Sequence, residues 1–122
     1  MNDRTPILVA EDEAMLRLIT VEVLQDAGFD VFEAADGAEA LDLLKANPGI
    51  ALLVSDIKMP RMDGYALVEA GLAFSPELKV LLMTGYSHDP PPAIQKIRDL
   101  QILRKPFNLE RLCTLAAEMT AA

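Results

Sequence analysis

The hydrophobic pattern of the chain consists of five short apolar runs, each followed by a longer segment in which apolar residues recur every three or four positions. The runs cover residues 7–10, 31–34, 51–54, 80–83 and 101–103. The first, third and fourth runs are apolar at every position, as expected of parallel strands that are covered on both faces. We therefore predict five short β-strands, each followed by a helix.

The predicted helices are marked by their apolar spacing and by residues that start or end helices. In the first helix, Met15, Leu16, Ile19, Val23, Leu24 and Ala27 line one apolar stripe of the kind that faces a core, and Gly28 closes the helix. The second carries Ala40, Leu41 and Leu44, and the third covers residues 65–74. A short fourth helix of about two turns is expected from Pro92, with Ile94, Ile97 and Leu100. The fifth carries Leu109, Leu112, Ala116 and Met119, with Asn108 as N-cap.

Five strand–helix units in succession predict an α/β fold, in which right-handed crossovers place helices on both faces of a parallel sheet. The 122 residues suit one domain, and no composition shift or linker indicates a second, so the prediction is a single domain over residues 1–122. In such open sheets, ligands bind outside the carboxyl ends of the strands. Candidate chemistry is therefore sought at those ends.

The predicted strand ends carry carboxylates, a hydroxyl and an ammonium group. Glu11 and Asp12 follow the first strand, Asp56 the third, Thr84 the fourth and Lys105 the fifth. If the first and third strands are neighbours, three carboxylates come close together, which raises their pKa values unless a cation intervenes. A carboxylate-rich cleft that handles phosphate suits Mg²⁺.

A carboxylate in this setting can act as a nucleophile and form an aspartyl phosphate. Asp56 is the candidate, with Lys105 neutralising the transferred oxygens and Thr84 donating a hydrogen bond to one of them. Each of these residues alone is a common loop arrangement, and an acidic pair after a strand also suits a helix N-terminus. The combination at four of the five strand ends is what favours phosphoryl chemistry.

Four segments of the chain resemble the signature blocks of response-regulator receiver domains, in the superfamily of the chemotaxis receivers. They are Ile7-Leu8-Val9-Ala10-Glu11-Asp12-Glu13, Ser55-Asp56-Ile57-Lys58-Met59-Pro60-Arg61-Met62-Asp63-Gly64, Met83-Thr84-Gly85 and Lys105-Pro106-Phe107. The resemblance covers the chain from about Thr5 to Met119. It implies a flavodoxin-like, doubly wound sheet of five parallel strands in the order 2-1-3-4-5 with five helices.

The resemblance also implies roles for individual residues. Asp56 is the expected phosphoacceptor, and Mg²⁺ is expected on Glu11, Asp12, Asp56 and the backbone carbonyl of Lys58, with Asp12 the more direct ligand of the acidic pair. Thr84 is the expected switch hydroxyl and Lys105 the phosphate-binding cation, followed by a cis peptide bond to Pro106. The implied partners are a sensor histidine kinase or a histidine phosphotransfer protein, and a downstream protein that binds the face formed by the fourth helix, the fifth strand and the fifth helix.

Two features depart from the common receiver pattern. Receivers commonly carry an aromatic switch residue three positions before the lysine, where this chain has Ile102. Tyr86, two positions after Thr84, resembles a Thr-Gly-Tyr subgroup in which the aromatic residue sits in the loop; an ordinary loop tyrosine is the alternative. The second departure is a run of three prolines before the fourth helix, in a loop where His88 is expected to be solvated.

Composition and charge narrow the possible functions further. The net charge of −8 argues against nucleic-acid binding, because a phosphate backbone requires a basic face. No apolar run approaches the roughly 18 residues of a membrane span, and residues 1–6 are too short and polar for a signal peptide. Cys113 is the only cysteine, which excludes a disulfide framework and predicts a thiol on the core side of its helix. We expect a cytoplasmic protein with no membrane or nucleic-acid partner.

Other classes of function fit the sequence less well. A phosphatase of the haloacid-dehalogenase type needs a second aspartate two residues after its nucleophile, where this chain has Lys58, and its nucleophile follows the first strand. A flavin- or dinucleotide-binding module needs a glycine-rich loop after the first strand, which is absent. A receiver that is not phosphorylated would not need the complete set of site residues. The prediction is a phosphoacceptor signalling domain that catalyses only its own phosphorylation and dephosphorylation, either as a stand-alone protein or as part of a hybrid kinase or longer regulator.

Overall fold

Strands and helices alternate along the whole chain in the computed structural model, which describes residues 4–85, 90–105 and 108–121. The strands are β1 (Pro6–Ala10), β2 (Asp30–Ala34), β3 (Leu52–Asp56), β4 (Lys79–Thr84) and β5 (Gln101–Arg104). The helices are α1 (Ala14–Asp26), α2 (Gly37–Ala46), α3 (Gly64–Phe74), α4 (Pro92–Gln95) and α5 (Leu109–Thr120). Both lists agree with the predicted order of elements.

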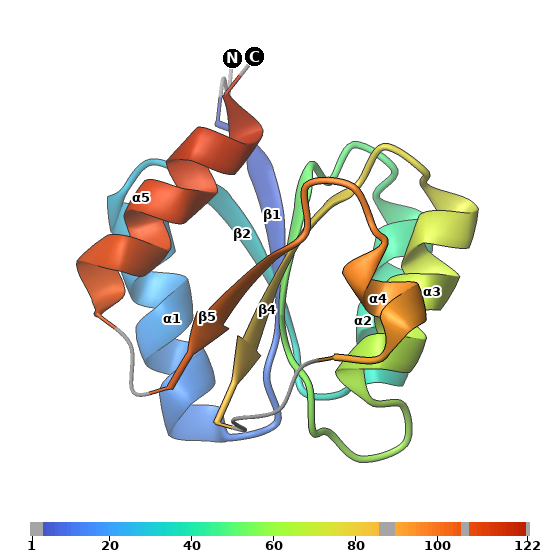
Figure 1. Cartoon of the computed structure of the whole chain (residues 1–122). Coiled ribbons are helices and arrows are strands. Elements are labelled where there is room, and N and C mark those ends of the chain that lie inside the picture. Colours follow the sequence, from blue (N-terminus) through green and yellow to red (C-terminus); the bar gives the residue numbers. More distant parts are fainter. Residues whose placement is uncertain (1–3, 86–89, 106–107, 122) are drawn as a thin grey trace.

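The five strands form one parallel sheet in the order β2-β1-β3-β4-β5, as predicted (Figure 1). Ala10 of β1 pairs with Ser55 of β3, and Asp56 pairs with Met83 of β4. The carboxyl ends of these three strands therefore lie level with one another. This register brings the residues that follow β1 and β4 alongside the end of β3.

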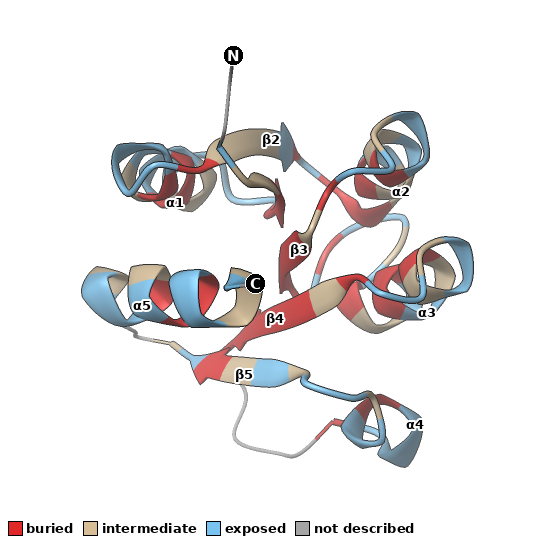
Figure 2. Ribbon diagram, turned by 90° about the horizontal axis from the view of Figure 1, so that it is seen from above, coloured by how far each residue is buried: buried red, intermediate tan, exposed pale blue. Residues whose placement is uncertain are grey.

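Helices cover both faces of the sheet, with α1 and α5 on one face and α2, α3 and α4 on the other (Figure 1 and Figure 2). Side chains alternate between the faces along each strand: Ile7 and Val9 of β1 enter the core under α1 and α5, whereas Leu8 and Ala10 enter the opposite core. All five residues of β3 are buried. Continuous burial explains why the central strands are apolar at almost every position.

Local signals account for several element ends. Gly28 has a φ of 103° directly after the C-cap of α1, a left-handed conformation that glycine adopts without steric cost. The side chain of Asn108 accepts a hydrogen bond from the backbone N–H of Glu110, as expected of an N-cap. Cys113 is half-buried on the core side of α5, in agreement with its predicted place.

The predicted core face of the first helix is only partly correct. Leu24 is fully buried and Val23 packs against the core, but other residues of the predicted stripe are not buried. Met15 and Ile19 are exposed, Ala27 is exposed as well, and the buried residues of α1 are Thr20, Val21 and Leu24. Apolar residues occur almost all round this helix, so their spacing does not single out one face. Packing against β1, β2 and α5 decides which face is buried.

The fourth helix is shorter than predicted. It starts at Pro92 as expected, but it ends at Gln95, so Ile97 and Leu100 lie beyond it in turns that lead to β5. Ile94 is fully buried and anchors this single turn. Within the described ranges, no helix combines the length and hydrophobicity needed to cross a membrane.

We predict that Thr20→Val stabilises the protein. The Thr20 side chain is fully buried, and its hydroxyl has no hydrogen-bond partner among the described residues. An unsatisfied buried hydroxyl costs about 1–3 kcal/mol, so valine, which has a similar shape, is expected to raise the free energy of unfolding by about 1 kcal/mol. Urea unfolding measures the change. Thr120→Val is the control, since the Thr120 hydroxyl donates to the Ala116 carbonyl; equal effects in both variants would contradict the explanation.

Candidate functional site

Asp56 is the last residue of β3, and its carboxylate lies at the carboxyl edge of the sheet. The residue is largely buried, and its Oδ1 accepts a hydrogen bond of 2.8 Å from the backbone N–H of Ile57. Gly64 packs directly against the Asp56 carbonyl, where a Cβ atom would overlap the carbonyl oxygen. The backbone of Asp56 and Ile57 is therefore tightly confined, which restricts where the Asp56 carboxylate can point.

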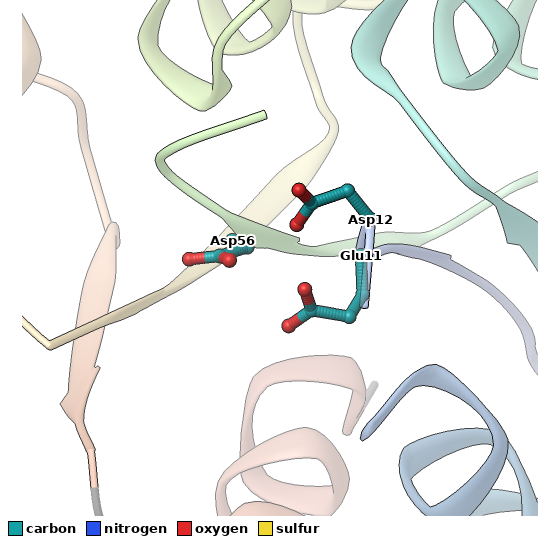
Figure 3. A group of neighbouring side chains, drawn as sticks. All are labelled: Glu11, Asp12 and Asp56. Atoms are coloured by element: carbon teal, nitrogen blue, oxygen red, sulfur yellow. The ribbon is translucent and has the colours of Figure 1, made fainter. Parts of the chain in front are cut away.

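Glu11 and Asp12 follow β1 and lie beside Asp56, as the sequence predicts. One carboxylate oxygen from each of the three residues lies within 4.8 Å of the other two. Figure 3 shows the three side chains directed toward a common space. Glu11 is fully buried, whereas Asp12 is exposed. The group combines a fixed inner carboxylate with one that solvent can reach.

The position of Glu11 is fixed by three hydrogen bonds. Its backbone N–H donates to the Ala34 carbonyl at 3.0 Å, and its Oε2 accepts from the backbone N–H of Glu13 at 3.1 Å. Arg17 of α1 donates from Nη1 to the Glu11 carbonyl at 2.8 Å and also pairs with Glu33 at 3.2 Å. Arg17 is not among the site residues predicted from the sequence. Its place one turn into the helix after the acidic run is the only signal that could have drawn attention to it.

Lys105 supplies positive charge to the carboxylate group. Its Nζ lies 3.3 Å from Asp56 Oδ2 and 3.5 Å from Glu11 Oε1. Its backbone N–H donates to the Thr84 carbonyl at 2.6 Å, and the Thr84 residue is buried at the end of β4. The four strand ends named in the sequence analysis therefore converge on one site.

Burial and charge shift the pKa values of two groups in this site. Burial is the main cause that raises the pKa of Glu11 to about 7, and the neighbouring Asp56 carboxylate adds to the rise. Burial by itself would lower the pKa of Lys105, but the Asp56 and Glu11 carboxylates outweigh it and hold this pKa above its usual value. The site thus favours uptake of positive charge, as a proton or as a cation.

The three carboxylates fit a magnesium ion in chemistry and spacing. Mg²⁺ prefers oxygen ligands at about 2.0–2.1 Å in octahedral geometry, which places ligand oxygens roughly 3–4 Å apart. The carboxylate oxygens lie within 4.8 Å of one another, so small side-chain movements would bring them to the spacing of ligands in such a geometry. A divalent ion would also relieve the repulsion from Asp56, which adds to the rise in the pKa of Glu11.

Some predicted site residues are not tested by these contacts. Tyr86, His88 and Pro106, with its predicted cis bond, lie outside the described residues. Lys58 is exposed in the loop after Asp56, and the role of its carbonyl stays a prediction. Ile102 is half-buried in β5 and packs against the core under α2, α3 and α4.

Comparison with known proteins identifies the class of this molecule. The chain belongs to the response regulator receiver domain family, whose model matches residues 7–117. It is a two-component phosphoacceptor domain, as predicted, and the phosphatase alternative is not favoured.

Individual relatives agree with this assignment. The response regulator receiver protein CpdR of Brucella abortus is 36% identical, over 95% of this chain and 97% of the relative. The sensor kinase CckA of the same organism is 37% identical over 93% of this chain, which spans only 12% of that kinase. A crystal structure of a response regulator receiver protein from Sinorhizobium medicae superposes with a TM-score of 0.86 at 30% identity, covering 96% of this chain and 94% of that structure. Related domains thus occur both in short proteins and within long ones.

We predict that the metal-free protein loses stability as the pH rises from about 5 to 7.5. Because the folded protein holds a proton on Glu11 up to a pKa of about 7, against an ordinary value of 4.5, the folded state binds more protons than the unfolded state in this window, and the free energy of unfolding falls. Urea unfolding in EDTA measures the fall. Glu11→Gln should flatten the profile, and an unchanged profile in this variant would contradict the assignment.

Proposed function

We propose that this chain receives a phosphoryl group on Asp56 in a Mg²⁺-dependent reaction, from a sensor histidine kinase or a histidine phosphotransfer protein. The observation that carries the proposal is the position of the Asp56 carboxylate, which lies beside the Glu11–Asp12 pair and 3.3 Å from the Lys105 ammonium. Residues 1–122 would act as one receiver domain. With a kinase donor of this kind, the protein would act in the cytoplasm.

The proposed reaction forms an O–P bond and breaks an N–P bond. A carboxylate oxygen of Asp56 attacks the phosphorus of a phosphohistidine, and the donor imidazole leaves with the bonding electrons. The Ile57 N–H holds one oxygen of Asp56, and Lys105 lies where it can neutralise the charge of the incoming phosphoryl oxygens. Bound magnesium, held by Glu11, Asp12, Asp56 and the Lys58 carbonyl, would supply further charge neutralisation.

The chain would act as a signalling domain whose only catalysis is on itself. The aspartyl phosphate is an acyl phosphate, so attack by water at phosphorus returns the Asp56 carboxylate and inorganic phosphate. Thr84 would donate its hydroxyl hydrogen bond to a phosphoryl oxygen in the modified state. Both half-reactions would use the same groups, and the lifetime of the phosphoryl group would set the duration of the signal.

The phosphorylated state would be read at the face formed by α4, β5 and α5. The hydrogen bond from Lys105 N–H to the Thr84 carbonyl joins the end of β4 to the end of β5, so movement of Thr84 would be transmitted to β5. Ile102, which is aliphatic and half-buried in β5, would respond through packing, with Tyr86 as the proposed aromatic partner. Phosphate must favour one of two pre-existing arrangements for this to work.

The exposed side of α1 offers a docking surface for the phosphodonor. Met15, Leu18 and Ile19 are large apolar residues with exposed fractions of 64%, 51% and 38%. They lie on the helix that begins two residues after Asp12, at the rim of the acidic site. A donor protein must bring its phosphohistidine to this rim, and contact with α1 would bury these side chains.

The first test of the function is phosphorylation by acetyl phosphate with Mg²⁺. The wild type is expected to gain one acid-stable, base-labile phosphoryl group, and Asp56→Asn should gain none because the nucleophile is lost. Asp63→Asn is a matched control, since Asp63 caps α3 by accepting from the Ala66 N–H and asparagine caps equally well. Intact mass spectrometry gives the stoichiometry; full labelling of Asp56→Asn would disprove the site.

Asp12→Ala is expected to weaken Mg²⁺ binding to the unphosphorylated protein by at least about fivefold. The loss of one carboxylate near a divalent ion removes at least about 1 kcal/mol of attraction. Isothermal titration calorimetry measures the dissociation constant. An unchanged affinity would show that the ion, if bound, lies elsewhere.

The docking surface is tested with two phosphodonors. Met15→Lys is expected to slow transfer from a phosphorylated histidine phosphotransfer protein about 10-fold, because a lysine disrupts an apolar contact of about 1.4 kcal/mol. The rate with acetyl phosphate should not change, since a small donor needs no docking. Phe74→Lys, at an exposed apolar position on α3, is the control; equal slowing by both variants would argue against a docking role for α1.

A further inference from the structure

The loop between β3 and α3, residues 57–63, determines what surrounds Asp56 on one side. It carries Lys58, whose carbonyl is an expected metal ligand. The loop is closed at its base by a 2.6 Å hydrogen bond from the Gly64 N–H to the Ile57 carbonyl, and a turn at its tip joins the Met62 N–H to the Pro60 carbonyl at 2.7 Å. These bonds shape the loop but do not attach its tip to the rest of the domain.

Asp36 provides that attachment from the loop between β2 and α2. The residue is almost fully buried, and its two carboxylate oxygens have different partners. Oδ1 accepts a 2.8 Å hydrogen bond from the Glu39 N–H and caps α2, whereas Oδ2 accepts from Nε of Arg61 at 3.0 Å and from Nη2 of the same guanidinium. One carboxylate therefore connects the N-terminus of α2 to the tip of the loop.

A second contact lies directly beside this pair. Gly37, the first residue of α2, faces the backbone of Met62 so closely that a Cβ atom on it would overlap the Met62 carbonyl oxygen. Two consecutive residues of the loop after Asp56, Arg61 and Met62, thus lie against the N-cap and the first residue of α2. A contact of this kind fixes both the distance and the orientation of the two loops.

The backbone of Arg61 shows that the loop is held in place by its surroundings. Arg61 has a φ of 68°, in the left-handed region that residues with a side chain seldom occupy. Such a conformation persists only where neighbouring contacts stabilise it. The ion pair with Asp36, in which two guanidinium nitrogens donate to the same oxygen Oδ2, is a contact of this kind, and its loss would leave the loop free to relax.

We propose that Asp36 and Arg61 are positioning residues that hold the loop after Asp56, and with it the Lys58 carbonyl, in the arrangement that binds Mg²⁺ and permits phosphoryl transfer. Neither residue belongs to the carboxylate group around Asp56. The inference rests on the proposed function of Asp56. It adds a role for α2, which contributes no residue to the carboxylate group itself.

Mg²⁺ affinity of the unphosphorylated protein tests the proposal, with Asp36→Asn, Arg61→Gln and the double variant. Asparagine keeps the helix cap, but its amide nitrogen cannot accept a hydrogen bond from the guanidinium of Arg61. Each single variant is expected to weaken Mg²⁺ binding about 10-fold, as for residues that support metal ligands from outside. The double variant should bind Mg²⁺ as tightly as either single variant, because both substitutions remove the same interaction. Arg61→Lys should recover part of the affinity.

A matched control comes from the opposite edge of the sheet. Lys79 Nζ pairs with Asp99 Oδ2 at 2.9 Å, and Asp99 also has a positive φ of 63°. Lys79→Gln therefore removes an ion pair to a residue in a left-handed backbone conformation, far from Asp56. This substitution should leave the Mg²⁺ affinity unchanged. Urea unfolding in EDTA, measured on every variant, separates a loss of affinity from a general loss of stability.

The outcomes separate this inference from the proposed function. If the wild type binds Mg²⁺ and is phosphorylated on Asp56 while the Asp36 and Arg61 variants keep wild-type affinity, the positioning role is wrong and the function stands. Strictly additive losses in the double variant, or an equal loss in Lys79→Gln, would also overturn it. If the wild type neither binds Mg²⁺ nor accepts a phosphoryl group, both proposals fail.

Discussion

Repulsion among three carboxylates at one edge of a parallel sheet is the constraint on which this molecule depends. Glu11, Asp12 and Asp56 each place an oxygen within 4.8 Å of the others, and the ammonium of Lys105 lies 3.3–3.5 Å from two of them. One ammonium cannot neutralise three carboxylates. The raised pKa of Glu11 reflects first the burial of its carboxylate and then the nearby charge of Asp56. A bound cation would offset both costs.

The rest of the fold keeps these groups together. The buried strands fix the register between β1, β3 and β4, so the residues beyond their ends cannot separate without disrupting the core. Backbone contacts at Gly64 and Gly37 confine the loop after Asp56 from two sides. Arg17 and the Glu13 N–H hold Glu11 from α1. Parts of the fold that supply no carboxylate to the site thus determine the position of the carboxylates that could bind a cation.

The sequence predicted the strands and the convergence of the strand ends because continuous apolar runs and their terminal residues are local signals. It failed where the answer depends on packing. The buried face of α1 could not be inferred from its sequence, because apolar residues lie on most sides of this helix. The fourth helix ends after one turn, although the apolar spacing continues to Leu100. The Asp36–Arg61 pair joins residues 25 positions apart. The sequence holds no local signal for this pair, because the two residues come together only when the sheet brings their loops side by side.

The arrangement of the domain ends has a consequence for architecture. Thr5 meets Asp30 at the amino edge of the sheet, and α5 returns there, bringing Thr120 and Ala121 beside Pro48 and Gly49 (Figure 1). The carboxylates of Glu11, Asp12 and Asp56 lie at the opposite edge. A polypeptide joined before β1 or after α5 would therefore start at the edge of the sheet far from these carboxylates. This separation is compatible with both settings in which similar domains occur: the short protein CpdR, 97% of which aligns with this chain, and the sensor kinase CckA, 12% of which does.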